Sequence, residues 1–251
     1  MDIVLFSMIA MRMTGLIFMN PLLGRRNFPN NMKAGMVLVF TFLVYSTIEE
    51  PELSYEFSSS FLYGFLLLKE FLVGYVLGYV MELFFFVITH AGSIIDFHMG
   101  LSMSMVYDPQ TNAQIAMTGN IFQIFYVLLF FAVDGHLVLI RTLLTSGELV
   151  PYGEVAFTQE LAMAVLELFR GCMVLAVRFA FPILAIELLV EVAVGIMMKV
   201  APQVNIFVIN IQIKIAVGFL TLLILISPMK SWLESLMHQM LTAMGEILTL
   251  L

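Results

Sequence analysis

Charged residues are scarce in this 251-residue chain, and their scarcity excludes a soluble globular protein. Asp, Glu, Lys and Arg make up 12% of the residues, whereas hydrophobic residues make up 61%. A soluble domain typically has about 25% charged and about 45–50% apolar residues. The mean hydropathy of +1.03 points the same way. We therefore predict a membrane protein, and because no polar linker or low-complexity tract divides the chain, a single membrane domain over residues 1–251.

Basic residues and cysteine are also few. Lys and Arg number 11 against 18 Asp and Glu, for a formal net charge of −7. The basic residues are scattered, which excludes a nucleic-acid-binding surface, because such surfaces need clustered Lys and Arg. Cys172 is the single cysteine. A disulfide framework or a cysteine metal site within the chain is therefore excluded.

The long apolar stretches predict an all-α fold built from integral membrane helical hairpins. Residues 61–95 would form a helix about 52 Å long at about 1.5 Å per residue, which exceeds a hydrocarbon core of about 30 Å. Residues 161–200 are also too long for one span, and Pro182 predicts a kink there. Ser227 and Pro228 are typical of a helix start. The predicted helices are 3–23, 34–48, 61–95, 121–140, 161–200 and 205–226, followed by a short amphipathic helix over 227–251.

Ionisable residues lie in the middle of most of these apolar stretches. A charge at the bilayer centre costs from roughly 3 kcal/mol to above 10 kcal/mol, depending on the scale used. We therefore expect these side chains to face protein or water instead of lipid. They are Arg12, Lys69, Glu70, Glu82, Asp134, Glu167, Arg170, Arg178, Glu187, Glu191 and Lys214.

Two of these sets share a helix face. Glu167 and Arg170 are three residues apart, and Glu187 and Glu191 are four apart, so each pair can interact within its helix or with a neighbouring subunit. Acidic residues outnumber basic ones, so we favour contacts between subunits. Because Glu187 and Glu191 have no cation nearby in the sequence, a proton relay is the alternative. The predicted intersubunit charges are Glu167, Arg170, Arg178, Glu187, Glu191 and Lys214.

The segment from Asp96 to Thr118 is too polar for a lipid-facing helix and too apolar for a solvated linker. Irregular backbone at membrane depth is tolerated where it is buried in protein or lines a cavity. A loop that lines a pore meets this condition. Four methionines carry flexible thioether side chains that could close around objects of variable shape, namely Met99, Met103, Met105 and Met117. The alternative is that they fill gaps in the packing, in a chain with 20 methionines.

Catalytic and metal-binding patterns are weak. Asp96 and His98 have no third ligand nearby, so hydrogen-bonded structural roles are favoured. His90, His136 and His238 are isolated and are interpreted in the same way. Ser227 and Lys230 match a Ser-x-x-Lys pattern, but helix capping explains them better. We predict no catalytic residue, no metal and no cofactor, and therefore no enzyme.

Three motifs in order resemble a known family, the FliR subunits of the flagellar type III export gate. The first lies near the N-terminus, the second contains Asp108-Pro109 within Gly100 to Thr111, and the third is the run from Ala201 to Phe207 after Pro182. The residues that carry the resemblance outside the second motif are Arg12, Gly15, Pro21, Gly24, Pro29, Lys33, Pro182, Pro202, Gln203 and Asn205.

The resemblance implies a role in protein export. FliR subunits assemble with FliP and FliQ into a helical pore, near the subunit FlhB and other export-apparatus and basal-body proteins. Residues 1–160 would form a FliP-like part and 161–226 a FliQ-like hairpin. The family's plug loop maps onto about 100–114 and would close the channel to unfolded protein substrates. The implied plug or gasket residues are Met99, Gly100, Met103, Met105, Asp108 and Pro109.

The resemblance also implies a multi-pass protein of the bacterial inner membrane, in the flagellar basal body. Three alternatives stay open. The first is the homologous subunit of the injectisome export apparatus. The second is a secondary transporter, which should show related halves, although residues 1–125 and 126–251 show no repeat. The third is an intramembrane enzyme, for which we find no motif.

Overall fold

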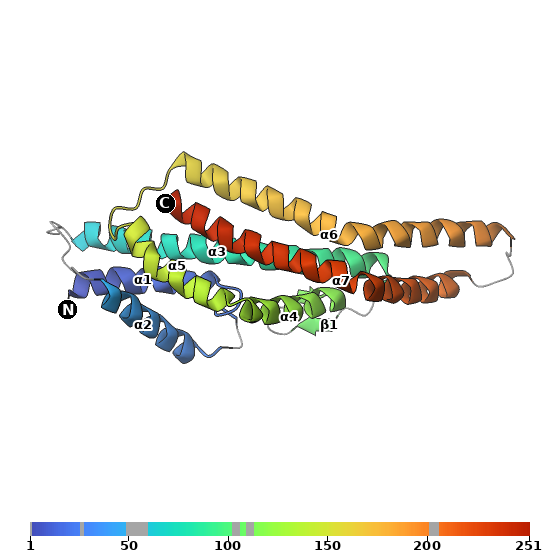
Figure 1. The fold of residues 1–251 in the computed structure, drawn as a ribbon, viewed down its shortest axis with the longest axis horizontal. Helices are drawn as coiled ribbons and strands as arrows, with labels where there is room; N and C mark the ends of the chain where they lie inside the picture. Colours follow the sequence, from blue (N-terminus) through green and yellow to red (C-terminus); the bar gives the residue numbers. More distant parts are fainter. Residues whose placement is uncertain (1, 26–27, 49–59, 102–105, 109–112, 201–205) are drawn as a thin grey trace. The chain divides into compact units, whose positions relative to one another are not determined.

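The computed structural model describes residues 2–25, 28–48, 60–101, 106–108, 113–200 and 206–251. The described residues form long helices and one short pair of strands, and the predicted all-α class is confirmed (Figure 1). Among the described residues, three helices are long and apolar enough to span a membrane, or up to four spans if the bent pair Met117–Ala132 and Gly135–Leu149 counts as one. The elements are α1 (Ile3–Met19), α2 (Asn30–Thr47), α3 (Ser60–His98), β1 (Val106–Asp108), β2 (Ala113–Ile115), α4 (Met117–Ala132), α5 (Gly135–Leu149), α6 (Gln159–Val200) and α7 (Ile206–Thr249).

The chain forms two compact units, and each unit collects segments that are distant in sequence. Unit 1 contains Met1–Phe84, Phe130–Phe169 and His238–Leu251. Unit 2 contains Phe85–Leu129 and Arg170–Met237. The long helices α3, α6 and α7 each contribute residues to both units. The predicted division at residues 160 and 226 concerns likeness to partner subunits and stays a prediction.

In unit 1, α1 packs against α3 with the two backbones in contact. Asp2 begins α1 by accepting hydrogen bonds from the N–H groups of Val4 and Leu5, at 2.9 and 3.3 Å. A Cβ atom built on Gly74 of α3 would lie 1.8 Å from the Arg12 carbonyl oxygen of α1, and one built on Gly15 would lie 2.0 Å from the Phe71 oxygen. Glycine at these positions therefore permits the close approach that holds Arg12 against α3.

In unit 2, aromatic rings fill the space between the end of α3, helix α4 and the parts of α6 and α7 that belong to this unit, residues 170–237, which we call the α6–α7 arms. Phe85 meets Tyr126 edge to face at 5.1 Å between ring centroids, and Phe122 meets Phe179 at 5.2 Å. Phe179 in turn lies 4.3 Å from Trp232. Edge-to-face pairs of this kind stabilise by about 0.5–1.5 kcal/mol beyond burial of their area. The rings therefore join α3, α4, α6 and α7 in one core.

One predicted helix is divided in the structure. The prediction of a single helix over 121–140 is wrong, because α4 ends at Ala132 and α5 begins at Gly135. Asp134 between them has a φ of 56°, in the left-handed region, which no helix can continue through. The Phe130 ring occupies the space next to Gly135, where a Cβ would come within 2.6 Å of it. An apolar sequence on both sides concealed this break.

The predicted helix start at Ser227 is also wrong. Helix α7 runs without interruption from Ile206 to Thr249, with Pro228 inside it. Proline fits the helical φ but removes one hydrogen bond and crowds the preceding turn. Met229, Leu233 and Leu236 follow at spacings of three and four residues and are at least 93% buried, which offsets that loss. Pro182 lies inside α6 in the same way.

Candidate functional site

Arg12 is the centre of a buried polar network in unit 1. The Arg12 side chain is fully buried and donates from Nε to Glu70 Oε2 at 2.7 Å. Its other nitrogens donate to the backbone carbonyls of Ser146 at 2.9 Å and Val150 at 3.0 Å. These carbonyls belong to the end of α5, where the helix dipole favours a positive charge. The expectation that Arg12 faces protein instead of lipid is confirmed.

The loop that follows α5 is held by the same network. Glu70 Oε1 accepts a hydrogen bond from the Gly153 N–H at 2.8 Å, and Lys69 Nζ donates to the Val155 carbonyl at 3.0 Å. The Arg12 guanidinium lies over the Tyr152 ring, 4.2 Å from its centroid. Burial raises the pKa of Tyr152, and the nearby Arg12 charge partly opposes this rise. The network satisfies its buried charges within the chain, whereas the buried Tyr152 hydroxyl has no hydrogen-bond partner among the described residues.

The N-terminal motif residues form a compact turn after α1. Asn20 Oδ1 accepts hydrogen bonds from the N–H groups of Leu22 and Leu23, at 2.8 and 3.0 Å. Lys33 Nζ donates to the Gly24 carbonyl at 2.7 Å and so joins the start of α2 to this turn. Pro21 is buried and Pro29 precedes the first residue of α2. Sequence reasoning missed Asn20, although its place directly before Pro21 is typical of a turn.

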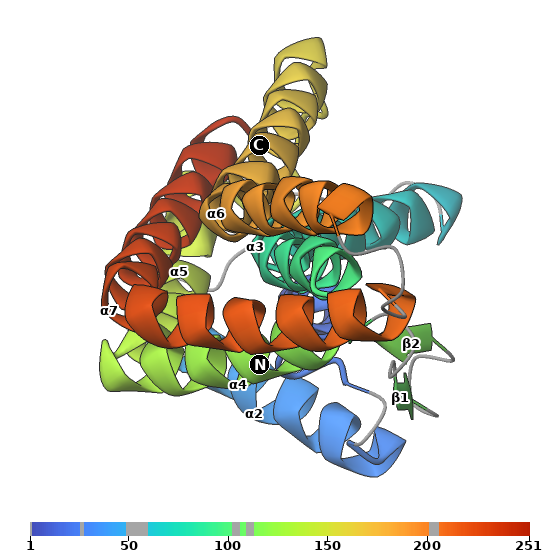
Figure 2. The ribbon, with the colours of Figure 1, turned by 90° about the vertical axis from the view of Figure 1, so that its right-hand side faces the viewer.

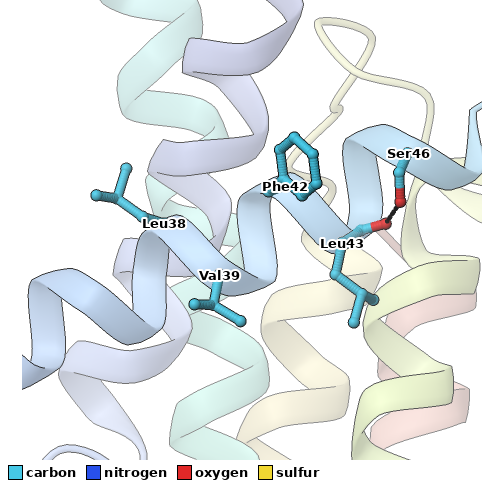
Figure 3. A pocket seen from close by; sticks show the side chains of 5 residues that line it. All are labelled: Leu38, Val39, Phe42, Leu43 and Ser46. Carbon is cyan, nitrogen blue, oxygen red and sulfur yellow. Dashed lines mark hydrogen bonds between the residues drawn. The ribbon is translucent and has the colours of Figure 1, made fainter.

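The outer face of α2 is apolar. Leu38, Val39 and Phe42 are 57%, 62% and 66% exposed, and they line a shallow groove with Leu43 and Ser46 (Figure 3). The Ser46 hydroxyl donates to the Leu43 carbonyl at 2.8 Å and so presents no free donor. This face fits an apolar neighbour.

The ends of the predicted plug segment are tied together in unit 2. Both oxygens of the buried Asp96 carboxylate accept from the Thr118 N–H, at 3.4 and 3.2 Å. The backbones of Gly92 and Gly119 touch, since a Cβ on Gly92 would lie 2.1 Å from the Gly119 Cα. Asp96 therefore caps the start of α4 from α3. The structural role expected for Asp96 is confirmed.

Strands β1 and β2 lie between these ends. They pair antiparallel, with Val106 opposite Ile115 and Asp108 opposite Ala113, and lie side by side in Figure 2. Irregular backbone was predicted over this stretch, so a strand pair is a correction. It satisfies backbone groups that an irregular loop would leave unpaired. Of the predicted plug residues, Met103, Met105 and Pro109 lie outside the described residues, and of Asp108 only the backbone is described.

Met99 and Gly100 link α3 to this segment. Gly100 has a φ of +77°, the left-handed conformation with which many helices end. The Met99 side chain is fully buried in a notch of α7, where a Cβ on Gly218 would lie 2.5 Å from the Met99 Cε. Met99 thus packs against α7, as the gap-filling alternative expected.

The charges of α6 and α7 behave differently from Arg12. Lys214 Nζ of α7 lies 3.4 Å from Glu191 Oε1 of α6, and the Glu191 side chain is 57% exposed. Glu187 is buried, yet neither of its carboxyl oxygens has a hydrogen-bond partner. Lys214 is the cation that sequence proximity did not reveal, because it comes from the other arm. Glu167, Arg170 and Arg178 are exposed on α6, and Pro202, Gln203 and Asn205 lie outside the described residues.

The described residues contain no group of three or more His, Cys, Asp or Glu side chains able to hold a metal ion. The described residues therefore form a helical membrane protein. The charges around Arg12 are satisfied within the chain, whereas charged side chains on α6 are exposed. Comparison with known proteins decides its family. A family model described as "Bacterial export proteins, family 1" matches residues 3–240.

The chain belongs to this export-protein family, which includes FliR. It is 31% identical to the flagellar biosynthetic protein FliR of Bacillus subtilis over 226 residues, covering 88% of this chain and 86% of that protein. It is 29% identical to FliR of Pectobacterium carotovorum, and the match covers 95% of this chain and 90% of that protein. The secretion system apparatus protein SsaT of Salmonella typhimurium is 23% identical, and the match covers 77% of this chain and 75% of that protein. The predicted FliR resemblance is confirmed.

Proposed function

We propose that this chain is the FliR-type subunit of a flagellar protein export gate in the bacterial inner membrane. In this proposal it assembles with FliP and FliQ subunits, beside FlhB and other export-apparatus and basal-body proteins, into the channel for unfolded flagellar proteins. Residues 1–160 form the FliP-like part and 161–226 the FliQ-like hairpin. The chain has no catalytic role in this assembly.

The observation that supports the proposal most is the exposure of the apolar helices α6 and α7. In the most apolar stretch of α3, 61% of the residues are buried, against 28% for α6 and 11% for α7. The arms nevertheless carry exposed charges such as Arg178 and Glu191. Lipid is a costly neighbour for such groups, whereas a partner subunit or a water-filled channel is not. A chain built for assembly explains both the exposure and the charges.

The flagellar system is favoured over the injectisome. The FliR of Bacillus subtilis is more similar than SsaT, both in identity, 31% against 23%, and in the share of this chain that is covered, 88% against 77%. We therefore keep the injectisome homologue as the second candidate. Export substrates would separate the two, because the flagellar candidate predicts that loss of this chain abolishes flagellar filaments.

In the proposed channel, residues 100–114 form the plug, and Met103 and Met105 seal it. The hydrogen bonds between Asp96 and Thr118 support this assignment, because they hold together the two ends of the segment. A plug contributes more to closure than to the helix contacts that hold subunits together. Its removal should therefore open the channel without dispersing the complex.

Deletion of the residues around Ser104 tests the plug. In membranes that contain this chain with FliP and FliQ, the deletion should cause a leak of small ions while the three subunits still purify together. Replacing Met103 and Met105 with alanine should leak less, since the backbone stays in the path. Changing Pro202 or Asn205 should impair assembly without a leak. Loss of the complex with no conductance would show that the segment is a structural connector.

A further inference from the structure

The carboxyl groups of Glu187 and Glu191 in α6 lie in the neighbourhood of the Lys214 ammonium group of α7. Lys214 Nζ lies 3.4 Å from Glu191 Oε1, and Glu187 lies one helical turn before Glu191 on α6. Glu191 is half exposed, whereas Glu187 is 1% exposed and its two oxygens have no hydrogen-bond partner. Lys214 therefore pairs with the carboxyl group that water can also solvate. The buried carboxyl group, which needs a partner more, has none.

The surface around Glu191 has the form of a helix contact. Leu188 and Val192 beside it are 51% and 61% exposed. Gly195, one turn further on, has open space around it, since an added Cβ would meet no atom within 4 Å. Small residues of this kind let the backbone of a second helix approach closely. A helix docked over Gly195 would cover Glu191 and take it out of water.

Covering this surface would leave both carboxyl groups buried, with Lys214 paired to Glu191 and no cation paired to Glu187. Such an arrangement is costly unless a second positive charge arrives with the covering helix. Lipid tails bring no such charge. Charge complementarity therefore specifies the occupant as an apolar helix that carries one arginine or lysine.

We propose that the Leu188–Gly195 face of α6 docks an apolar helix of a neighbouring subunit whose single Arg or Lys pairs with Glu191, so that Lys214 turns to Glu187. The proposal rests on the proposed function, because it needs a partner subunit. It assigns Glu191 to the interface and Glu187 to the interior of the hairpin. Lys214 changes its partner when the complex assembles.

A steric block tests the docking face. In cells that also express FliP and FliQ, Gly195→Leu should reduce co-purification of these subunits by about tenfold or more, because the close approach is lost. Gly171→Leu is the matched control, since Gly171 lies on the same helix and also has open space around it. A photo-crosslinking residue at Val192 should link to a protein subunit. Crosslinks to lipid alone, or equal co-purification of both variants, would overturn the docking face.

Charge substitutions test the change of partner. Lys214→Gln should weaken co-purification, because it leaves Glu187 buried without a cation. Adding Glu187→Gln to that variant should restore it, whereas adding Glu191→Gln should not. If Glu191→Gln restores co-purification of the Lys214→Gln variant and Glu187→Gln does not, Lys214 pairs only with Glu191. The proposed change of partner from Glu191 to Glu187 would then be wrong. The same purified variants without partners give the control for folding, read as the amount of protein extracted from membranes.

The two proposals fail in different ways. If the unchanged chain does not co-purify with FliP and FliQ, the proposed function is wrong. If it does, and Gly195→Leu and the crosslinks behave as the control does, only the docking face is wrong.

Discussion

Each unit contains a pair of opposite charges on apolar helices, Arg12 with Glu70 in unit 1 and Lys214 with Glu191 in unit 2. The two pairs differ in how far the chain itself buries them and satisfies their hydrogen bonds. Arg12 and Glu70 are fully buried, with Arg12 Nε 2.7 Å from Glu70 Oε2, and backbone groups at the end of α5 and in the loop after it satisfy their remaining atoms. Lys214 and Glu191 lie at 3.4 Å with Glu191 57% exposed, and Glu187 beside them has no hydrogen-bond partner. The first network is finished within one chain, and the second is not.

The comparison separates two uses of charge in a membrane protein. A buried ion pair with all its hydrogen bonds fixes how helices pack, and its loss is felt within the chain. An incomplete one favours assembly, because a partner can complete it. We therefore expect substitutions in unit 1 to change the stability of the isolated chain. Substitutions among the α6–α7 charges should change assembly instead.

The largest effect should come from Arg12. Arg12→Met leaves Glu70 buried without its cation and should cost about 3–5 kcal/mol. Thermal unfolding of the detergent-solubilised chain measures this loss. The double variant with Glu70→Gln should recover part of the stability.

A surface pair gives the control for Arg12. Lys230 and Glu234 lie at 3.6 Å, with side chains 73% and 40% exposed. Lys230→Met should therefore change stability by less than about 1 kcal/mol. Equal effects of Arg12→Met and Lys230→Met would contradict the structural role of the unit 1 network.

Gly74→Ala should have the next largest effect. Its Cβ would lie 1.8 Å from the Arg12 carbonyl, a backbone atom that cannot rotate away. Helices α1 and α3 must then separate, at a cost of about 2–3 kcal/mol. Gly64→Ala on the same helix meets no atom within 4 Å and should be neutral or slightly stabilising. A shared midpoint temperature for the two variants would show that α1 and α3 do not pack this closely.

Gly218→Ala should cost less, about 1 kcal/mol, at the lower end of overpacking effects. The atoms that its Cβ would meet belong to the Met99 side chain, at 2.5–2.9 Å, and methionine is flexible. A proteolysis assay of the purified chain should show faster cleavage near Met99, because the displaced side chain loosens the end of α3. No change in cleavage would indicate that Met99 does not occupy the notch.

The smallest effect concerns Tyr152. Burial raises its pKa above the ordinary value, so the folded chain holds the phenolic proton more tightly than the unfolded chain does. The stability that this tighter proton binding gives the folded chain is fully present below about pH 10 and is lost as the pH rises above that value. Tyr152→Phe keeps the ring under Arg12 and removes this dependence. Unfolding midpoints of the two proteins should diverge above about pH 10, and parallel curves would contradict the burial.

Sequence reasoning succeeded where the physical constraint was local. Charges such as Arg12 in apolar runs predicted burial against protein, and the lengths of α3 and α6 followed from unbroken apolar stretches. Pairing could not be predicted, because Glu70 and Lys214 come from helices distant in sequence from their partners. The break at Asp134 was missed since apolar residues on both sides match a single helix. Pro228 misled because tertiary packing of α7 overrides its local preference.

The most direct test of the account is expression of this chain with and without FliP and FliQ. Because the α6–α7 charges are incomplete within the chain, the account predicts a small monodisperse fraction in mild detergent when the chain is alone. Co-expression should raise that fraction and yield one complex of the three proteins. A stable, monodisperse monomer in the absence of partners, unchanged by their presence, would contradict it.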